Sequence, residues 1–426
     1  MNKTITKQFL LPFILVTSLF FLWGLANNMT DTLLAAFKKI MSMTDFQTSW
    51  IQVAFYGSYF CLAIPAAIFI KKYSYKTGII LGLSLFATGA LLFYPASQSM
   101  VYGHFLIALF ILAGGLSILE TTANPYIIAM GDPETGTRRL NLAQSFNPLG
   151  SIFGVVLSKW FILSNLQEYS ESERAAMSTE QLEAVQAEEL SAVMEPYVGL
   201  AVFLILLALY FLATKMPVAS DTDKRLDFGP TFTRLLKNST YTWGVIAQFF
   251  YVGAQICVWS FTIRYVMQEL SLNEEAASTY YIAALILFTL SRFVFTAMME
   301  RISPAKLLGY CSLAAMAFSA GVMFLGGMPG VICLIGISGC MSLMFPTIFG
   351  LASEGLGEDR KIGGSGLIMA ILGGALLPML MGQVSDVFDS INLAYLVPLL
   401  CFGVVYYYAI QPKTIFQAQS EKELIN

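Results

Sequence analysis

Amide and carboxylate side chains recur at helical spacing inside apolar segments of the first half of the chain. Asn27 and Asn28 precede Asp31 by four and three residues, Glu120 precedes Asn124 by four, and Gln144 precedes Asn147 by three. Residues three or four apart share one face of a helix. Because amides and carboxylates bind hydroxyl groups and protons, we expect the three faces to converge on one cavity that holds protons and sugar-like hydroxyls.

Glu120 lies near the middle of its apolar segment. A charged carboxylate at the centre of a bilayer costs roughly 2.5 to 3.5 kcal/mol, so the neutral, protonated form is favoured there. Such a group is able to take up a proton on one side of a membrane and release it on the other. The alternative is a glutamate that stays protonated and only joins helices. Asp31 lies nearer the outer end of its segment, where the alternative is a solvated charge at a helix end.

The second half of the chain has fewer polar residues in its apolar segments. The internal repeat places Met341 where Glu120 lies in the first half. We therefore expect the second half to supply Gln255 together with aromatic surface from Tyr251, Trp259 and Phe345.

Two arginines, Arg264 and Arg292, also lie within apolar segments. Arg264 is close to the outer edge, and its long side chain is expected to extend to water. Arg292 is close to the inner end, where we expect a carboxylate such as Glu354 to pair with it.

Three prolines follow polar or aromatic residues at membrane depth, in Asn124-Pro125, Asn147-Pro148 and Phe345-Pro346. Each proline removes one helical hydrogen bond and crowds the preceding turn, so a helix break is expected at each. Breaks inside a membrane are tolerated where they line a cavity. Simple packing kinks are the alternative.

The composition requires a membrane around these segments. Of 426 residues, 57% are apolar and 12% are charged, whereas soluble domains are about 45 to 50% apolar and about 25% charged. The mean hydropathy is +0.68 and the pI is near 5.4. These values exclude a soluble globule, a disordered chain and a nucleic-acid binder.

Twelve stretches reach the roughly 20 residues that a helix needs to cross a bilayer. They predict an all-α membrane protein with the limits 9–37, 45–70, 77–95, 103–130, 140–163, 196–215, 241–268, 276–299, 306–326, 330–353, 363–384 and 391–411. A cytoplasmic N-terminus places 18 of the 24 Lys and Arg residues on the inner face, in agreement with the positive-inside rule. Both termini are therefore expected on the cytoplasmic face.

The twelve spans are predicted to form two pseudo-symmetric six-helix bundles, 1–215 and 241–426, joined by a cytoplasmic linker at 216–240. Gly24 and Gly253 are 229 residues apart, as are Lys72 and Arg301. Such a repeat is typical of bundles that rock about a central site. The outer connection 164–195 contains eight glutamates and is expected to be a solvated helical excursion.

The sequence offers little material for metal binding or catalysis. His104 is the lone histidine, and no two of the six cysteines form a Cys-x-x-Cys pair. Metal centres and disulfide frameworks require closely spaced ligands, so we expect no metal site, no cofactor and no enzyme activity. A membrane enzyme and a sugar sensor that does not transport stay open as alternatives.

Six runs of sequence closely resemble the bacterial fucose permeases, a family of L-fucose:proton symporters in the major facilitator superfamily. The runs are 20–23, 27–31, 119–125, 139–147, 251–255 and 345–349. The resemblance covers essentially the whole chain, including the outer excursion. It implies the major facilitator fold and import of a monosaccharide with a proton by alternating access.

The resemblance also implies residue roles. Asp31 and Glu120 match the family's protonatable carboxylates, and Asn28, Gln144 and Asn147 match its sugar-binding amides. Asn124, Gln255, Tyr251 and Phe345 complete the predicted substrate site. Phe345 stands where the family has a tyrosine, so one hydroxyl contact to sugar is missing and the sugar is open among L-fucose, other hexoses, pentoses and amino sugars. The expected partners are the sugar, the proton and the bilayer, and a monomer is expected.

Overall fold

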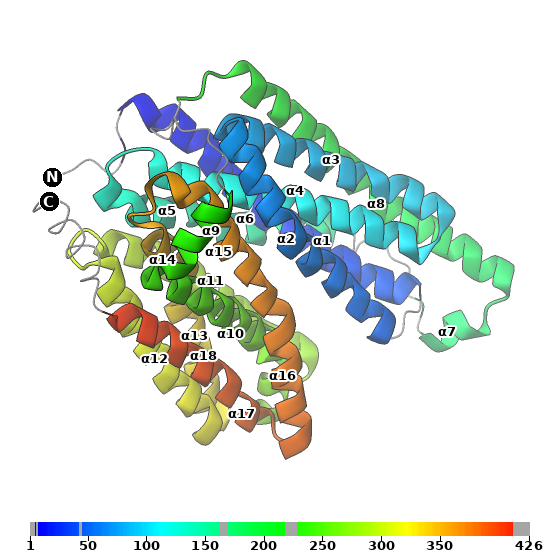
Figure 1. Ribbon diagram of the computed structural model, residues 1–426. Helices are drawn as coiled ribbons and strands as arrows, with labels where there is room; N and C mark the ends of the chain where they lie inside the picture. The colour runs from blue at the N-terminus through cyan, green and yellow to red at the C-terminus, as the bar shows by residue number, and fades with distance from the viewer. Residues whose placement is uncertain are drawn as a thin grey trace, which may run out of the picture. The chain divides into compact units, whose positions relative to one another are not determined.

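The computed structural model describes residues 5, 7–41, 45–161, 169, 171–217 and 228–411 (Figure 1). Within these ranges it leaves out the side chains of residues 7, 30–39, 45–49, 171, 172, 175, 192 and 193. The side chain of Asp31 therefore lies outside the described part of the chain, as do residues 218–227 of the predicted linker. All regular elements among the described residues are helices.

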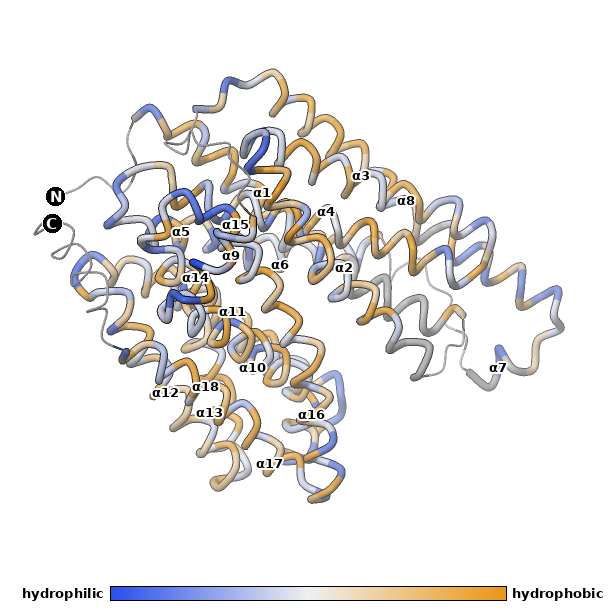
Figure 2. Tube along the Cα trace, viewed as in Figure 1, coloured by the Kyte–Doolittle hydropathy of each residue, from blue (hydrophilic) through white to orange (hydrophobic). Residues whose placement is uncertain are grey.

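The helices of the first half are α1 (Leu10–Ile40), α2 (Asp45–Lys72), α3 (Tyr75–Ser99), α4 (Tyr102–Ala129), α5 (Gly136–Gln144), α6 (Asn147–Phe161), α7 (Glu171–Ala176) and α8 (Thr179–Ala213). Those of the second half are α9 (Phe228–Lys237), α10 (Ser239–Leu270), α11 (Glu274–Met298), α12 (Pro304–Phe324), α13 (Gly327–Met341), α14 (Met344–Ser353), α15 (Arg360–Met369), α16 (Gly373–Phe388), α17 (Ile391–Ala394) and α18 (Leu396–Ile410). Figure 2 shows apolar residues along most of their length and hydrophilic residues concentrated near their ends.

Eleven helical stretches in the described ranges are long and apolar enough to cross a membrane. The predicted fifth span is not among them: it is divided, as the tenth span is, and its first part, Gly136–Gln144, is also rich in polar residues. Its two parts, α5 and α6, have 9 and 15 residues, and each is shorter than the roughly 20 residues of a complete span. Together with the eleven stretches, the α5–α6 pair accounts for all twelve predicted segments.

The prolines act differently in the three places where breaks were predicted. Helix α4 continues through Pro125, so the break expected there is wrong. The fifth span is interrupted at residues 145 and 146, just before Asn147-Pro148, and the tenth at residues 342 and 343, just before Met344. In the two interrupted spans the proline lies within the first turn of the new helix, where its missing N–H is tolerated.

The chain divides into two compact units. The N-terminal unit consists of Leu10–Ala123 and Phe146–Val218, and the C-terminal unit of Met1–Phe9, Asn124–Ser145 and Ala219–Asn426. The segment Asn124–Ser145 joins the C-terminal unit because α5 packs against α14 and α11. The bundle boundary at 216–240 stays a prediction from the sequence.

In the N-terminal unit, α1 packs against α6 and α3 against α8. The α1–α6 crossing is a backbone contact. A Cβ atom at Gly150 would lie 1.8 Å from the carbonyl oxygen of Phe21, and one at Gly24 would lie 2.0 Å from that of Asn147. The helices approach this closely because Gly150 and Gly154 form a small-x-x-x-small pattern.

The C-terminal unit contains an equivalent crossing between α10 and α16. A Cβ atom at Gly373 would lie 2.0 Å from the carbonyl oxygen of Phe249, and one at Gly253 would lie 2.1 Å from Cδ1 of Leu377. Gly24 and Gly253, which the sequence repeat places in register, thus serve the same purpose in the two units. In the same unit α12 lies beside both α13 and α18 (Figure 1).

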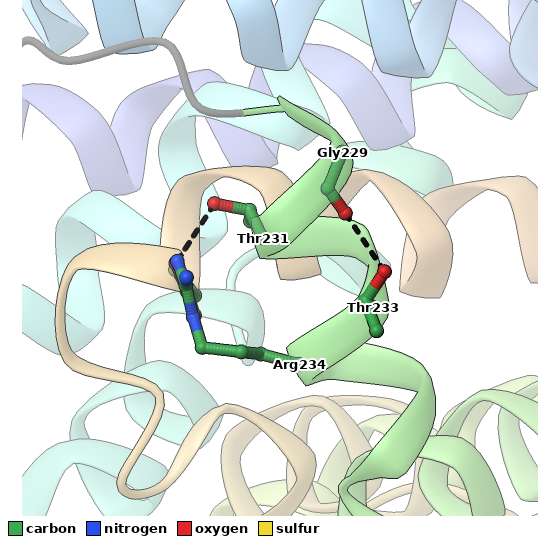
Figure 3. A network of polar contacts seen from close by, with 5 residues as sticks. Gly229, Thr231, Thr233 and Arg234 are labelled. Atoms are coloured by element: carbon green, nitrogen blue, oxygen red, sulfur yellow. Dashed lines mark hydrogen bonds and ion pairs between the residues drawn. The ribbon is translucent and has the colours of Figure 1, made fainter.

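A short amphipathic helix, α9, precedes the second half of the spans. Arg234 in α9 forms a two-pronged ion pair with Asp359, at 2.7 and 2.8 Å. Arg234 also donates to the hydroxyl of Thr231, and Thr233 donates to the carbonyl of Gly229 (Figure 3). These contacts fix α9 to the turn that precedes α15.

Candidate functional site

Glu120 lies in α4 and its side chain is 1% exposed. Its Oε2 atom is buried and has no hydrogen-bond partner among the described residues. A buried carboxylate with an unsatisfied oxygen is costly when charged. The side chain of Glu120 therefore lies inside the protein and not on its outer surface. The cavity in which the sequence places it together with the amides stays a prediction.

Tyr59 in α2 is the neighbour of Glu120 that sequence reasoning missed. Its side chain is 1% exposed and forms a hydrogen bond with the Glu120 carboxyl group. A tyrosine in an apolar span resembles ordinary packing, and only the rule that a buried phenol seeks a polar partner would have marked it. Tyr59 gives Glu120 a single side-chain contact.

Helix α1 adds further polar atoms to the N-terminal unit. The Oδ1 atom of Asn27 is buried without a hydrogen-bond partner in the described part of the chain. Asn28 is half-buried, and its amide donates to the carbonyl of Gly24 at 3.3 Å. The unit that holds Glu120 thus also holds an unsatisfied acceptor on α1.

Asn147 begins α6 and is half-buried. Its Nδ2 atom donates to the carbonyl of Phe20 in α1 at 3.1 Å. This bond holds the start of α6, just after the break in the fifth span, against α1. It also fixes the orientation of the amide group, and with it the position of the Oδ1 atom of Asn147.

Gln144 and Asn124 form the other amide pair, in the C-terminal unit. Nε2 of Gln144 donates to Oδ1 of Asn124 at 2.7 Å, and both side chains are buried. The Nδ2 atom of Asn124 has no hydrogen-bond partner among the described residues. The structure therefore brings together two of the predicted site residues and leaves one buried amide donor available.

Helix α5, which ends at Gln144, is held to α14 by side-chain hydrogen bonds. Asn141 donates to the hydroxyl of Thr347 at 3.1 Å, and Thr137 donates to Glu354 at 3.2 Å. A Cβ atom at Gly350 would lie 2.5 Å from the Thr137 hydroxyl. The polar start of the fifth span is thus packed closely against the second part of the tenth.

The prediction that Arg292 pairs with a carboxylate such as Glu354 is wrong. Arg292 is buried, and its guanidinium donates to the carbonyls of Ser342 and Gln144 and lies over the ring of Phe288. Glu354 instead accepts from Thr137. The reason is positional, because the side chain of Arg292 reaches the interrupted centres of the fifth and tenth spans rather than the helix end.

Tyr251, Phe345 and Gln255 lie in the C-terminal unit as well. Tyr251 is fully buried, its hydroxyl donates to the carbonyl of Met341 at 3.0 Å, and its ring meets Phe345 edge-on. Phe345 and Gln255 are half-buried. The hydrogen bond to Met341 fixes the position of the Tyr251 ring, and this ring packs against Phe345.

Among the described residues, no three His, Cys, Asp or Glu side chains are placed to share a metal ion. Arg264 is exposed near the C-terminal end of α10 and lies over the ring of Phe261.

Comparison with known proteins places this arrangement in context. The family model described as Major Facilitator Superfamily matches residues 16–377. The L-fucose-proton symporter of Haemophilus influenzae is 41% identical over 96% of this chain and 98% of its own, and that of Escherichia coli is 42% identical over 95% and 93%. A putative glucose/galactose transporter of Helicobacter pylori is 33% identical over 93% of this chain and 95% of its own.

Solved structures give the same result for the fold. The crystal structure of the E. coli fucose:proton symporter, FucP, is 41% identical, with a TM-score of 0.89 over 94% of this chain and 98% of that chain. The proton:xylose symporter XylE has a TM-score of 0.67 at 9% identity, which is a likeness of fold alone.

Proposed function

Because this chain belongs to the major facilitator superfamily, we propose that it is a proton-coupled sugar symporter that imports L-fucose or a related monosaccharide by alternating access. The predicted fold class, twelve membrane helices in two pseudo-symmetric bundles, is confirmed by the family and the structural match. The chain is a transporter and not an enzyme, as predicted.

The proposal of proton coupling rests on the surroundings of Glu120. Its carboxyl group is buried, has one oxygen without a partner among the described residues, and has Tyr59 as a hydrogen-bond neighbour. Among the described residues, no ion pair with a Lys or Arg stabilises a permanent negative charge on it. A carboxyl group in this setting gains or loses its proton when its surroundings change.

The sugar site is proposed to be built from amide side chains. Each of Gln144, Asn147 and Asn124 has one amide atom held by a hydrogen bond within the protein, and its other amide atom is proposed to bind a sugar hydroxyl. Asn28, Gln255, Tyr251 and Phe345 are the remaining proposed contacts, and Asp31 is the second proposed proton carrier. Binding of sugar among the amides accompanies protonation of the carboxylates, and both ligands leave when the bundles rock inward.

The energetics suffice for uphill transport. One proton that moves through about 100 mV supplies roughly 2.3 kcal/mol. At about 1.4 kcal/mol per factor of ten, this corresponds to roughly 50-fold accumulation of sugar.

The choice of sugar follows the relatives at 41 and 42% identity, whose names specify L-fucose. A glucose or galactose substrate is the second candidate, because a transporter so named is 33% identical. The membrane is proposed to be the bacterial inner membrane, with both termini in the cytoplasm and the chain as a monomer.

A panel of sugars added to weakly buffered, de-energised cells tests the proposal. L-fucose is expected to cause a transient rise in external pH in cells that contain this chain, because each sugar molecule carries a proton inward. D-glucose, D-galactose, D-xylose and D-glucosamine rank the specificity. A panel without any pH response would overturn proton-coupled sugar transport, and binding of sugar without proton movement would indicate a sensor.

A further inference from the structure

Arg292 donates hydrogen bonds to two carbonyl groups, each of which lies four residues before a proline. Nη1 of Arg292 donates to the carbonyl of Gln144 at 3.0 Å, and Nε donates to the carbonyl of Ser342. In an uninterrupted α-helix each carbonyl accepts from the N–H four residues later. The residues four positions after Gln144 and Ser342 are Pro148 and Pro346, and neither has an N–H to donate.

A single guanidinium therefore replaces both donors that the prolines remove. Gln144 is the last residue of α5 and Ser342 caps α13, so the two carbonyls are also at the negative ends of helix dipoles. Phe288 adds its ring face at 4.6 Å from the guanidinium carbon. No carboxylate lies within ion-pair distance of Arg292 in the described ranges, and these backbone and ring contacts compensate its buried charge.

The hydrogen bond from Arg292 to Gln144 involves a residue of the proposed sugar site. The backbone of Gln144 is held by Arg292, and its side-chain amide is held by Asn124. With both ends fixed, the unpartnered Nδ2 of Asn124 is kept in one position. Loss of the Arg292 bond frees the end of α5 just before the break and loosens this amide pair.

We infer that Arg292 is a positioning residue for sugar transport, which replaces the N–H groups of Pro148 and Pro346 and thereby holds the Gln144–Asn124 amide pair in its binding geometry. This inference rests on the proposed function. It extends that function by assigning a role to a buried cation that touches neither the sugar nor the proton carriers.

The first test measures uptake kinetics of the full chain in proteoliposomes with radiolabelled L-fucose. Arg292→Met is expected to raise KM about tenfold while Vmax per folded transporter stays within about threefold, because binding geometry is lost and the transport cycle is kept. Arg292→Lys is expected to restore part of the affinity through one carbonyl. Fewer active molecules with an unchanged KM would mean a purely structural residue and would overturn the inference.

Arg139 provides the matched control. It is also fully buried and donates to backbone carbonyls, those of Ile127 at 2.7 Å and Ile128 at 2.5 Å, but neither belongs to the amide pair. Arg139→Lys is expected to lower thermal stability and leave KM within about twofold. An equal rise of KM in both variants would contradict a specific role for Arg292.

The second test does not depend on sugar. Replacing Pro148 and Pro346 by alanine returns the two N–H donors, so Pro148→Ala/Pro346→Ala is expected to restore about half of the Tm that Arg292→Met loses, a loss of about 5 °C. The same pair of substitutions in the wild-type background is expected to give no such gain. Equal effects on Tm in both backgrounds would show that Arg292 does not replace the N–H groups that the prolines lack. If the expected difference in Tm is found but the chain transports no sugar, the proposed function is refuted and Arg292 only stabilises the fold.

Discussion

Glu120 and Arg292 are both buried ionisable residues in membrane-spanning helices, but their surroundings differ. The guanidinium of Arg292 donates to two carbonyls and covers a phenylalanine ring, whereas the carboxyl group of Glu120 has an oxygen with no partner in the described structure. A charge compensated on several sides is a fixed part of the fold. A group left incomplete is able to change its protonation state, and this is the property that a proton-coupled transporter needs.

The largest effect is expected from Glu120→Gln, which keeps the shape of the side chain and removes its exchangeable charge. Uphill accumulation is expected to fall from roughly 50-fold to about onefold, while exchange of sugar across the membrane continues. Counterflow and concentrative uptake in the same proteoliposomes separate the two activities. Vesicles with Glu120→Gln that still concentrated sugar would show that this residue does not carry the coupled proton.

Glu269 is the control for this experiment because its carboxylate is compensated. Its oxygens accept from the backbone N–H of Gly327 at 2.5 Å and from the Asn392 amide at 2.9 Å. Glu269→Gln is expected to retain concentrative uptake. A loss as large as that of Glu120→Gln would remove the distinction between complete and incomplete carboxylates.

A smaller effect, on stability alone, is expected in the outer excursion. Arg174 and Glu189 form a buried two-pronged ion pair at 2.6 and 2.9 Å. Arg174→Met removes the cation from a carboxylate that stays buried, at a cost of about 3 to 5 kcal/mol in the free energy of unfolding. Urea unfolding in detergent measures this cost, and Arg174→Met/Glu189→Leu is expected to recover most of it. The KM for sugar is expected to stay unchanged, and a raised KM would show that the excursion takes part in transport.

The smallest effect is expected from Arg234→Ala, which breaks the ion pair with Asp359. The Arg234 side chain is 57% exposed, and exposed ion pairs contribute about 1 kcal/mol or less. The change in Tm is expected to be under about 2 °C and to vanish at 1 M salt, where screening is nearly complete. A large, salt-independent loss would indicate that solvent exposure is a poor guide to the value of a charge in this protein.

The spans were within reach of sequence reasoning because each rests on a local rule. About 20 apolar residues suffice to predict a span, and a glutamate within such a segment is conspicuous. The sequence also predicted that polar faces converge, but it did not specify that Gln144 donates to Asn124. The rule for prolines was applied correctly to the fifth and tenth spans and failed at Pro125, where the surrounding helix absorbs the missing bond.

The partners of Arg292 and the role of Tyr59 were not predictable in the same way. Pairing with a carboxylate is the usual fate of a buried arginine, and the carbonyl of Gln144 lies 148 residues away in sequence. The prolines did show which carbonyls lack a backbone N–H partner. The sequence around residue 292 does not indicate that Arg292 donates to them. Tyr59 carries no charge, and its contact with Glu120 depends on how α2 packs against α4.

The divided fifth span also has a consequence for how the polypeptide is assembled during synthesis. Helix α5 begins with Gly136, Thr137 and two arginines and is too short to span a bilayer, and its side-chain partners lie 206 and 217 residues further along. At about 5 to 20 residues per second, the ribosome needs roughly 10 to 40 s to produce them. During that interval α5 lacks the two hydrogen bonds from Asn141 and Thr137 that hold it to the tenth span in the folded chain.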